Sequence, residues 1–231
     1  MSFIISAVAY LRNCLNPFSS EITAPKCETP AYENDIVLDR EIRFYDSMAN
    51  QETAFLGNFY DESQVFYDKA WYPCAEAAFQ AAKTLDKTKR EAFKNLLRTG
   101  DGYDYLPGLE TKMDKDRVGH KAWYLGKQTF SIRSDWKEVQ DQVMHEIVYN
   151  KFNNNSFLKT SLLATGDAIL LETAPNDYWG IGKGGKGQNK LGKILMQVRV
   201  ELATSLSLKS RRLSSLDSTG LDSTGLRKRS F

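Results

Sequence analysis

The chain has few of the residues that would build a metal centre or a disulfide scaffold. Its 231 residues include three cysteines, Cys14, Cys27 and Cys74, and no two of them form a C-x-x-C pair. A sparse, odd set of cysteines argues against a disulfide framework and against a zinc ribbon. The two histidines, His120 and His145, are isolated from each other. We therefore expect a reducing compartment, a buried Cys74 and no metal site.

Long apolar runs are also missing. No segment approaches the roughly 18 apolar residues that a membrane-spanning helix needs. The apolar stretch 3–11 lacks a basic leader and a clear cleavage site, so we do not expect a secretory signal there. A helix that touches a membrane or docks onto a partner is the alternative for this stretch. We expect a cytoplasmic protein.

A strong charge of one sign is absent as well. The formal net charge of +2 does not favour a general nucleic-acid binder. From residue 204 onward, six basic residues face two acidic ones, and this end is rich in serine. We expect a disordered basic tail over 204–231, because it has too few apolar residues to offset its ordering entropy. Residues 1–40 contain three prolines, which indicates an arm or linker outside the core. The expected domain is 41–203.

Hydrophobic periodicity predicts a compact α+β domain that is rich in helix and has a small sheet. We expect strands over 42–45 and 168–173, a strand pair formed by 65–67 and 70–72, and a further extended piece within 55–60. We expect helices over 73–85, 91–97, 119–129, 136–152, 156–163 and 191–202, the first of them opened by Pro73. Tryptophan side chains are usually buried in the core. We expect Trp71, Trp123 and Trp136 to be buried in this way, and Trp179 to lie outside the core.

The segment from Trp179 to Asn189 contains five glycines and two lysines, and a helical apolar pattern follows at once. Glycines let backbone N–H groups approach a ligand, and the start of a helix offers unpaired N–H donors. The pattern predicts a cradle for a phosphate or ribose phosphate, with Lys183 and Lys186 as cationic donors. A plain flexible turn is the alternative. We reject a dinucleotide-binding fold, because one helix and the tail alone follow the G-x-G-x-x-G match.

Glu76 is the best candidate for a catalytic carboxylate. It shares one helix face with Gln80 and Lys83, at i, i+4 and i+7. The alternative is structural: Glu76 would complement the helix dipole in the first turn and pair with Lys83 through solvent.

Three blocks of residues, in the same order along the chain, resemble the NADAR (YbiA-like) family over about residues 42–202. They are Gly57-Asn58-Phe59-Tyr60, the run Trp71 to Lys83 (Trp-Tyr-Pro-Cys-Ala-Glu-Ala-Ala-Phe-Gln-Ala-Ala-Lys), and Trp179-Gly180 through Gly192, continued by 195–199. Between them, Arg133-Ser134-Asp135-Trp136 fits the middle region of the family. The chain departs at Gly57, where relatives often have Ser, at Ala77, where they often have His, and at Asp177, which lies one position closer to Trp-Gly than their acidic residue.

The resemblance implies an α+β fold and the hydrolysis of N-glycosidic bonds to ribose phosphates. The substrates described for the family include phosphorylated ribosylaminopyrimidine intermediates of riboflavin synthesis, and some relatives instead remove ADP-ribose from guanine bases. In the family pattern the glutamate at Glu76 is the catalytic carboxylate, and the tryptophan at Trp136 contacts the heterocycle. Trp179, Gly180 and Asn189 line the site.

The residues and the resemblance together predict a complete site without a metal or redox cofactor. Glu76 and Asp177, or a neighbour of Asp177, are the predicted catalytic groups. The predicted substrate-binding residues are Asn58, Phe59, Gln80, Lys83, Trp136, Trp179, Gly180, Gly182, Lys183, Lys186 and Asn189. The partner would be a small ribose-phosphate or ADP-ribose substrate, with nucleic acid involved only if ADP-ribosylated guanine is the substrate. Two alternatives remain: a non-catalytic reader of NAD or ADP-ribose, and an interaction protein that works through the arm and the tail.

Overall fold

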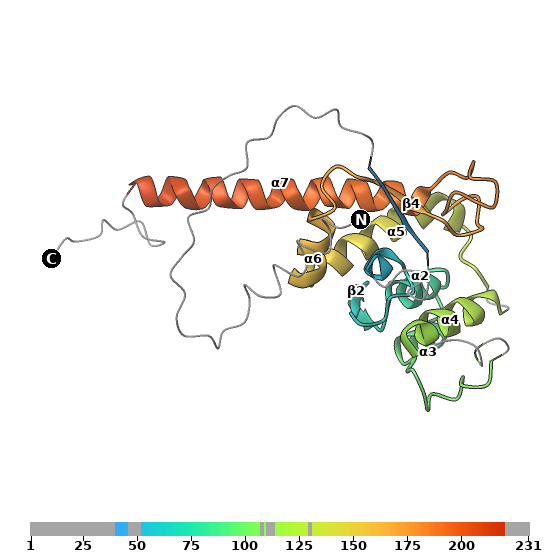
Figure 1. Ribbon diagram of the computed structural model, residues 1–231. Coiled ribbons are helices and arrows are strands. Elements are labelled where there is room, and N and C mark those ends of the chain that lie inside the picture. Colours follow the sequence, from blue (N-terminus) through green and yellow to red (C-terminus); the bar gives the residue numbers. More distant parts are fainter. Residues whose placement is uncertain (1–39, 46–51, 107–108, 110–113, 129–130, 220–231) are drawn as a thin grey trace, which may run out of the picture.

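The computed structural model describes residues 40–45, 52–106, 109, 114–128 and 131–219 (Figure 1). Helices pack around two small sheets, so the expected helix-rich α+β class is confirmed. In the described part of the chain, no helix is both long and apolar enough to cross a bilayer. The arm up to residue 39 and the tail from residue 220 lie outside the described residues.

The two sheets have two strands each. β1 (Glu41–Phe44) runs parallel to β4 (Ile169–Glu172), and Phe44 is opposite Glu172 in the register. Alternation in β1 buries Ile42 and Phe44, as a half-buried strand requires. β2 (Val65–Tyr67) and β3 (Ala70–Tyr72) form the expected antiparallel hairpin. The parallel pair matters for function, because it fixes where the last residue of β4 lies.

The expected helices are present, but their ends are shifted. The prediction of an extended piece within 55–60 is wrong, because η1 (Ala54–Leu56) is a 3₁₀ turn and turn residues follow it. The second helix begins earlier than expected, since the Asp86 side chain accepts the N–H of Thr88 at 2.9 Å and caps it. The six α-helices of the described residues are α2 (Ala75–Ala82), α3 (Lys87–Lys94), α4 (Asp114–Lys127), α5 (Trp136–Asn153), α6 (Ser156–Leu163) and α7 (Lys190–Thr219).

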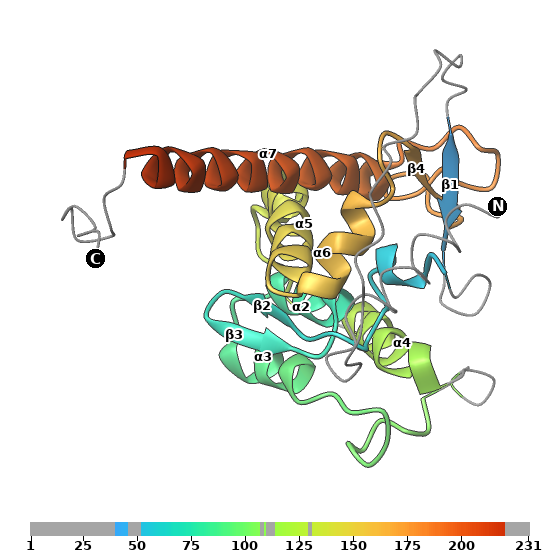
Figure 2. The same cartoon turned by 60° about the vertical axis from the view of Figure 1, so that its left-hand side comes forward.

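α2 is the central helix of the domain. All eight of its residues are buried, and Cys74, which precedes it, is buried as expected. Its alanines carry little side-chain volume, so α3, α4 and α5 can pack against it on different sides. Figure 2 shows α2 enclosed between α5 and α4. A glutamate in such a helix is therefore enclosed on all sides by the fold.

Two tryptophans expected in the core are instead on the surface. Trp71 is 50% exposed and lies beside Phe66 across the hairpin, with ring centroids 5.3 Å apart. Trp123 is 41% exposed, and the Lys127 ammonium lies 3.3 Å from the centroid of its ring. In each case a neighbouring side chain on the surface covers one face of the ring, which lowers the cost of its exposure.

α7 is much longer than the expected helix over 191–202. Its first turns bury Leu191, Leu195, Val198 and Leu202 against the body. The rest projects beyond α5 and α6, and its end is the red tip of the ribbon in Figures 1 and 2. α7 therefore continues through 204–219, where the sequence predicts a disordered tail. Extending an existing helix avoids the cost of nucleation, so a segment that mixes serine with leucine, lysine and arginine can continue it.

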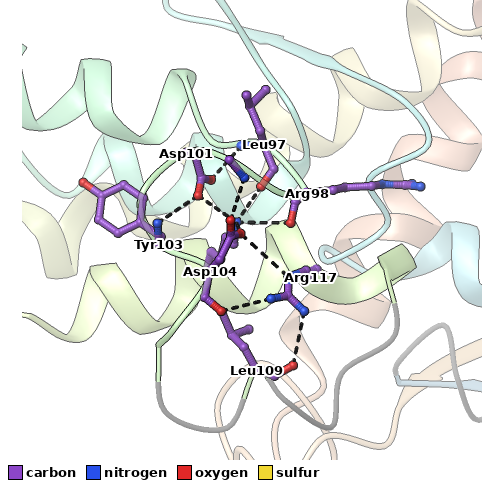
Figure 3. Close-up of polar contacts among 9 residues, drawn as sticks. Leu97, Arg98, Asp101, Tyr103, Asp104, Leu109 and Arg117 are labelled. Carbon is purple, nitrogen blue, oxygen red and sulfur yellow. Dashed lines mark hydrogen bonds and ion pairs between the residues drawn. The ribbon is translucent and has the colours of Figure 1, made fainter.

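The segment between α3 and α4 is held by Lys121 of α4, whose side chain is fully buried. Figure 3 shows Asp101 and Asp104 of this segment gathered with Leu97 and Arg98. The Lys121 ammonium donates to the carboxylates of Asp101 at 2.8 Å and Asp104 at 2.7 Å. It also donates to the carbonyls of Leu97 and Arg98. This one cation satisfies four acceptors and fixes the loop to the helix that packs against α2.

Candidate active site

Glu76 lies in the first turn of α2 with 6% of its surface exposed. Its N–H donates to the carbonyl of Asn58 at 2.9 Å, and its Oε1 accepts a hydrogen bond from Gln80 Nε2 at 2.6 Å. Burial raises the pKa of the Glu76 carboxyl, and the Gln80 hydrogen bond and the charge of Lys83 oppose that rise. The carboxylate of Glu76 is enclosed, so its interaction with Lys83 does not pass through bulk solvent as the structural alternative expected, while its place in the first turn still complements the helix dipole.

A second carboxyl group, that of Glu172 at the end of β4, lies close enough to Glu76 for the two charges to interact. Burial, and after it the negative charge of Glu76, raises the pKa of Glu172 to about 8. Its Oε2 is shielded from solvent and has no hydrogen-bond partner in the described part of the chain. Sequence reasoning missed Glu172. The available signal was an acidic residue near the end of an apolar strand.

Asp177, the second predicted catalytic group, lies elsewhere. It is exposed on the loop that follows β4. Gly182 has a φ of +66° and packs so closely on Asp177 that an added Cβ would overlap its Oδ1. The charge of Glu76 acts on Glu172, so Glu172 is the second carboxyl group that the structure brings into the range of Glu76.

Aromatic rings form a wall next to Glu76. Phe79, one helical turn along α2, packs against Trp136 with ring centroids 5.1 Å apart and against Trp179 with centroids 5.2 Å apart. The Lys83 ammonium lies 5.4 Å from the Phe79 centroid, and burial lowers the pKa of Lys83 while Glu76 raises it. The structure thus unites Gln80, Lys83, Trp136 and Trp179 around one helix. Phe79 was missed, although it sits on the same α2 segment as Glu76.

Four of the five glycine N–H groups of the expected backbone cradle already have acceptors within the chain. The N–H groups of Gly180, Gly182, Gly185 and Gly187 all donate to carbonyls of the chain itself. The first N–H groups of α7, on Lys190 and Leu191, donate to Tyr178 and Trp179. The loop closes on itself because nearby carbonyls satisfy its donors first. Lys183 and Lys186 remain exposed, and they are the cationic groups of this loop that an anion can reach.

Asn189 serves the fold at this point. It adopts a left-handed φ of 51°, which asparagine tolerates better than most residues. Its Oδ1 accepts the N–H of Glu172 at 3.0 Å, and its Nδ2 donates to the carbonyl of Leu170 at 2.8 Å. The Asn189 amide therefore fastens β4 to the start of α7 and positions Glu172.

The block around Asn58 and Phe59 contacts the backbone of Glu76, because the Asn58 carbonyl accepts the Glu76 N–H. Asn58 donates its side-chain amide to Met144 Sδ at 3.5 Å, and its enclosed Oδ1 has no hydrogen-bond partner among the residues that the structure describes. Phe59 lies edge-on to His120, with ring centroids 4.8 Å apart. Lys151, buried in α5, donates to the Gly57 carbonyl at 2.7 Å, and burial lowers the pKa of Lys151 to about 7. Sequence reasoning missed this lysine.

Glycoside-cleaving enzymes commonly use two carboxyl groups with different surroundings. Here Glu76 is buried and Glu172 is partly buried, and the rings of Phe79, Trp136 and Trp179 lie on the same helix face or next to it. The NADAR domain model matches residues 43–203, and the chain belongs to the NADAR family.

Known proteins agree with this assignment. The chain is 34% identical to N-glycosidase YbiA of Escherichia coli over 159 residues, which cover 63% of this chain and 88% of that protein. It is 34% identical to riboflavin biosynthesis protein VVA0006 of Vibrio vulnificus, covering 72% of this chain and 40% of that protein. The NMR structure of E. coli YbiA matches with a TM-score of 0.58 at 30% identity, over 74% of this chain and 89% of that one. The chain is an enzyme of this N-glycosidase family.

Proposed function

We propose that this enzyme hydrolyses the N-glycosidic bond of phosphorylated ribosylaminopyrimidine intermediates of riboflavin biosynthesis. The observation that carries the proposal is the buried carboxylate of Glu76, held by Gln80 at 2.6 Å beside the rings of Phe79 and its neighbours. The names of two similar proteins, an N-glycosidase and a riboflavin biosynthesis protein, support the bond and the substrate class.

Cleavage of a bond between ribose and nitrogen builds positive charge on the anomeric carbon. A fixed carboxylate in a water-poor site stabilises that charge strongly, because little solvent has to reorganise. The same carboxylate orients the attacking water and takes its proton. Glu76 is suited to both tasks, since the Gln80 hydrogen bond and the nearby Lys83 charge favour its ionised form. Hydrolysis changes no oxidation state, so the scheme needs no redox cofactor.

The base and the phosphate would be held by separate groups. Trp136 and Trp179 flank Phe79 and supply flat apolar surface for the pyrimidine. Lys183 and Lys186, exposed on the glycine-rich loop, would meet the 5′-phosphate as mobile cations. Binding energy at a remote phosphate helps to orient the reacting carbon.

The first experiment offers two substrate classes to the purified protein. A ribosylaminopyrimidine 5′-phosphate and an oligonucleotide with ADP-ribosylated guanine are incubated separately, and mass spectrometry detects released ribose 5-phosphate or ADP-ribose. We expect release of ribose 5-phosphate. Release of ADP-ribose alone would replace the proposed substrate with the alternative one, and binding without any release would support a non-catalytic reader.

The Glu76→Gln variant tests the residue assignment. It keeps the shape of the side chain and removes the charge, so kcat should fall by at least about a hundredfold while the melting temperature changes little. The matched control is Glu91→Gln on α3, whose carboxylate is exposed and bound to Lys94. Wild-type activity in Glu76→Gln would refute the role of Glu76, whatever the substrate.

A further inference from the structure

We infer that Glu172 is a catalytic residue, the general acid that gives a proton to the leaving nitrogen. This inference rests on the proposed function, and it assigns the two carboxyl groups of the site to different steps. Glu76 acts on the sugar and on water, and Glu172 acts on the base that departs. None of the sequence motifs contains this residue in a catalytic role.

The backbone of Glu172 is fixed at both of its polar atoms. Its N–H donates to Asn189 Oδ1 at 3.0 Å, and its carbonyl accepts the N–H of Ile181 at 2.8 Å. Both partners belong to the segment that carries Trp179, and β4 itself is paired with β1. The Glu172 side chain therefore extends from a backbone that is hydrogen-bonded on both sides. One of these sides is the segment that carries Trp179. Such rigidity is required of a group that must transfer a proton in one geometry.

The Glu172 carboxyl group lacks the hydrogen-bond partner that buried polar groups normally have. Its Oε2 is closed to solvent and unpaired among the described residues, which costs stability and is uncommon in folded proteins. Gln80, by contrast, donates to Glu76 Oε1. An enclosed carboxyl oxygen without an internal acceptor can donate its proton to a bound ligand. A substrate nitrogen would supply the missing partner.

The surroundings decide which carboxyl group keeps the proton. Two enclosed carboxylates repel each other, so one of them stays neutral at neutral pH. Burial raises the pKa of both carboxyl groups, but at Glu76 a hydrogen-bond donor and a cation oppose the rise, whereas at Glu172 the charge of Glu76 adds to it and the pKa reaches about 8. Because Glu172 also has an unpaired Oε2, we assign the proton to Glu172.

The step balances with water as the sole co-reactant. The bond between the anomeric carbon and nitrogen breaks, and its electron pair goes to the nitrogen, which takes the proton of Glu172. Water adds to the anomeric carbon and gives one proton to the carboxylate of Glu76. Passage of that proton from Glu76 to Glu172 restores both groups, and the products are a free ribose phosphate and a base that has gained one hydrogen.

The test compares two leaving groups in the variant Glu172→Gln. One substrate is a ribosylaminopyrimidine 5′-phosphate, whose nitrogen must be protonated to leave. The other is nicotinamide mononucleotide, whose pyridinium leaves as a neutral base without a proton. We expect kcat to fall by about 10²–10⁴ on the first substrate and by less than about tenfold on the second. A residue that only shaped the site would lose activity equally on both.

A pH profile provides a measurement that does not depend on the second substrate. Wild-type kcat on the aminopyrimidine should fall as the pH rises through about 8, because Glu172 loses its proton, and Glu172→Gln should lack that alkaline limb. Equal losses on both substrates, or an unchanged alkaline limb, would overturn the role of Glu172. A wild-type protein that cleaves no ribose-phosphate N-glycoside would instead overturn the proposed function itself.

Discussion

The amide of Asn189 holds the backbone of Glu172, with its Oδ1 3.0 Å from the Glu172 nitrogen. A residue at the start of α7 thereby sets the position of a carboxyl group at the end of β4. The resemblance implies that Asn189 lines the substrate site, yet both polar atoms of its side chain bind strand backbone. Asn189 would therefore affect the activity by positioning Glu172 and not by touching the substrate.

Asn189→Ala should destabilise the fold by about 2–4 kcal/mol. It removes two hydrogen bonds, leaves the Leu170 carbonyl without its donor, and places alanine at a φ of 51°. Asn189→Gly loses the same hydrogen bonds but accepts the left-handed backbone, so it should be less destabilising than alanine. Denaturant unfolding measures both variants. Gln188→Ala, at the exposed neighbouring position, should stay close to wild type, and equal stability of Asn189→Ala and wild type would contradict this role.

Gly126→Ala should lower kcat by tenfold or more while barely changing stability. Gly126 of α4 packs so closely on α2 that an added Cβ would overlap Gln80 Oε1. The end of Gln80 would have to move, which breaks its hydrogen bond to Glu76, and small misplacements of a reacting group cost large factors in rate. Alanine is a better helix former than glycine, and this offsets part of the strain.

The matched control for Gly126→Ala is Gly184→Ala, because a Cβ at Gly184 would meet nothing within 4 Å. Steady-state kinetics and thermal unfolding of both variants separate a displaced Gln80 from a damaged fold. Loss of the Gln80 hydrogen bond should also raise the pKa of Glu76, so the acid limb of the rate profile should move to higher pH. Unchanged kinetics in Gly126→Ala would show that Gln80 does not hold Glu76 in the working enzyme.

Local patterns predicted the elements well, because strands and helices follow from short-range periodicity. The hairpin at 65–72 and the α2 helix with its shared face of Glu76 and Gln80 are such cases. Contacts between residues that are far apart in the sequence could not be predicted, because they depend on how the backbone folds. Glu172 lies about a hundred residues from Glu76, and the parallel pairing of β4 with β1 places it there.

The glycine-rich segment shows why composition alone misled. Glycines permit both an open anion nest and a loop that closes on its own carbonyls, and the sequence pattern is the same for the two. In the structure, the N–H groups of Gly180, Gly182, Gly185 and Gly187 donate to backbone carbonyls of the same region. The end of α7 shows the opposite case, since a segment that mixes serine with leucine, lysine and arginine continues a helix that tertiary packing has already started.

Lys121→Met should destabilise the protein by at least about 3 kcal/mol. The Lys121 ammonium is fully buried and binds two carboxylates and two carbonyls, and methionine would remove the one cation that all four share. The loop between α3 and α4 should then open locally, so trypsin should cleave after Arg98 faster than in wild type. Lys127→Met, on the same helix with an exposed position beside Trp123, is the control. Equal proteolysis rates in Lys121→Met and wild type would refute the anchoring role of Lys121.

Glu172→Gln should gain stability relative to wild type as the pH rises. In wild type, the raised pKa of Glu172 means that folding stability is greatest below the unfolded value of about 4.3 and is lost as the pH rises through about 8. The unfolded chain releases the proton over this range while the folded chain keeps it. Glutamine has no proton to release, so the variant escapes this loss.

The stability difference between Glu172→Gln and wild type should therefore increase by at least about 1 kcal/mol from pH 5.5 to pH 9. Denaturant unfolding at several pH values measures it, and other titrating groups cancel because both proteins contain them. Glu91→Gln should show no such trend over this range, since a hydrogen bond to Lys94 lowers the pKa of Glu91. A constant difference for Glu172→Gln would mean that Glu172 is already ionised in the folded protein, which would also remove the proton that its proposed role requires.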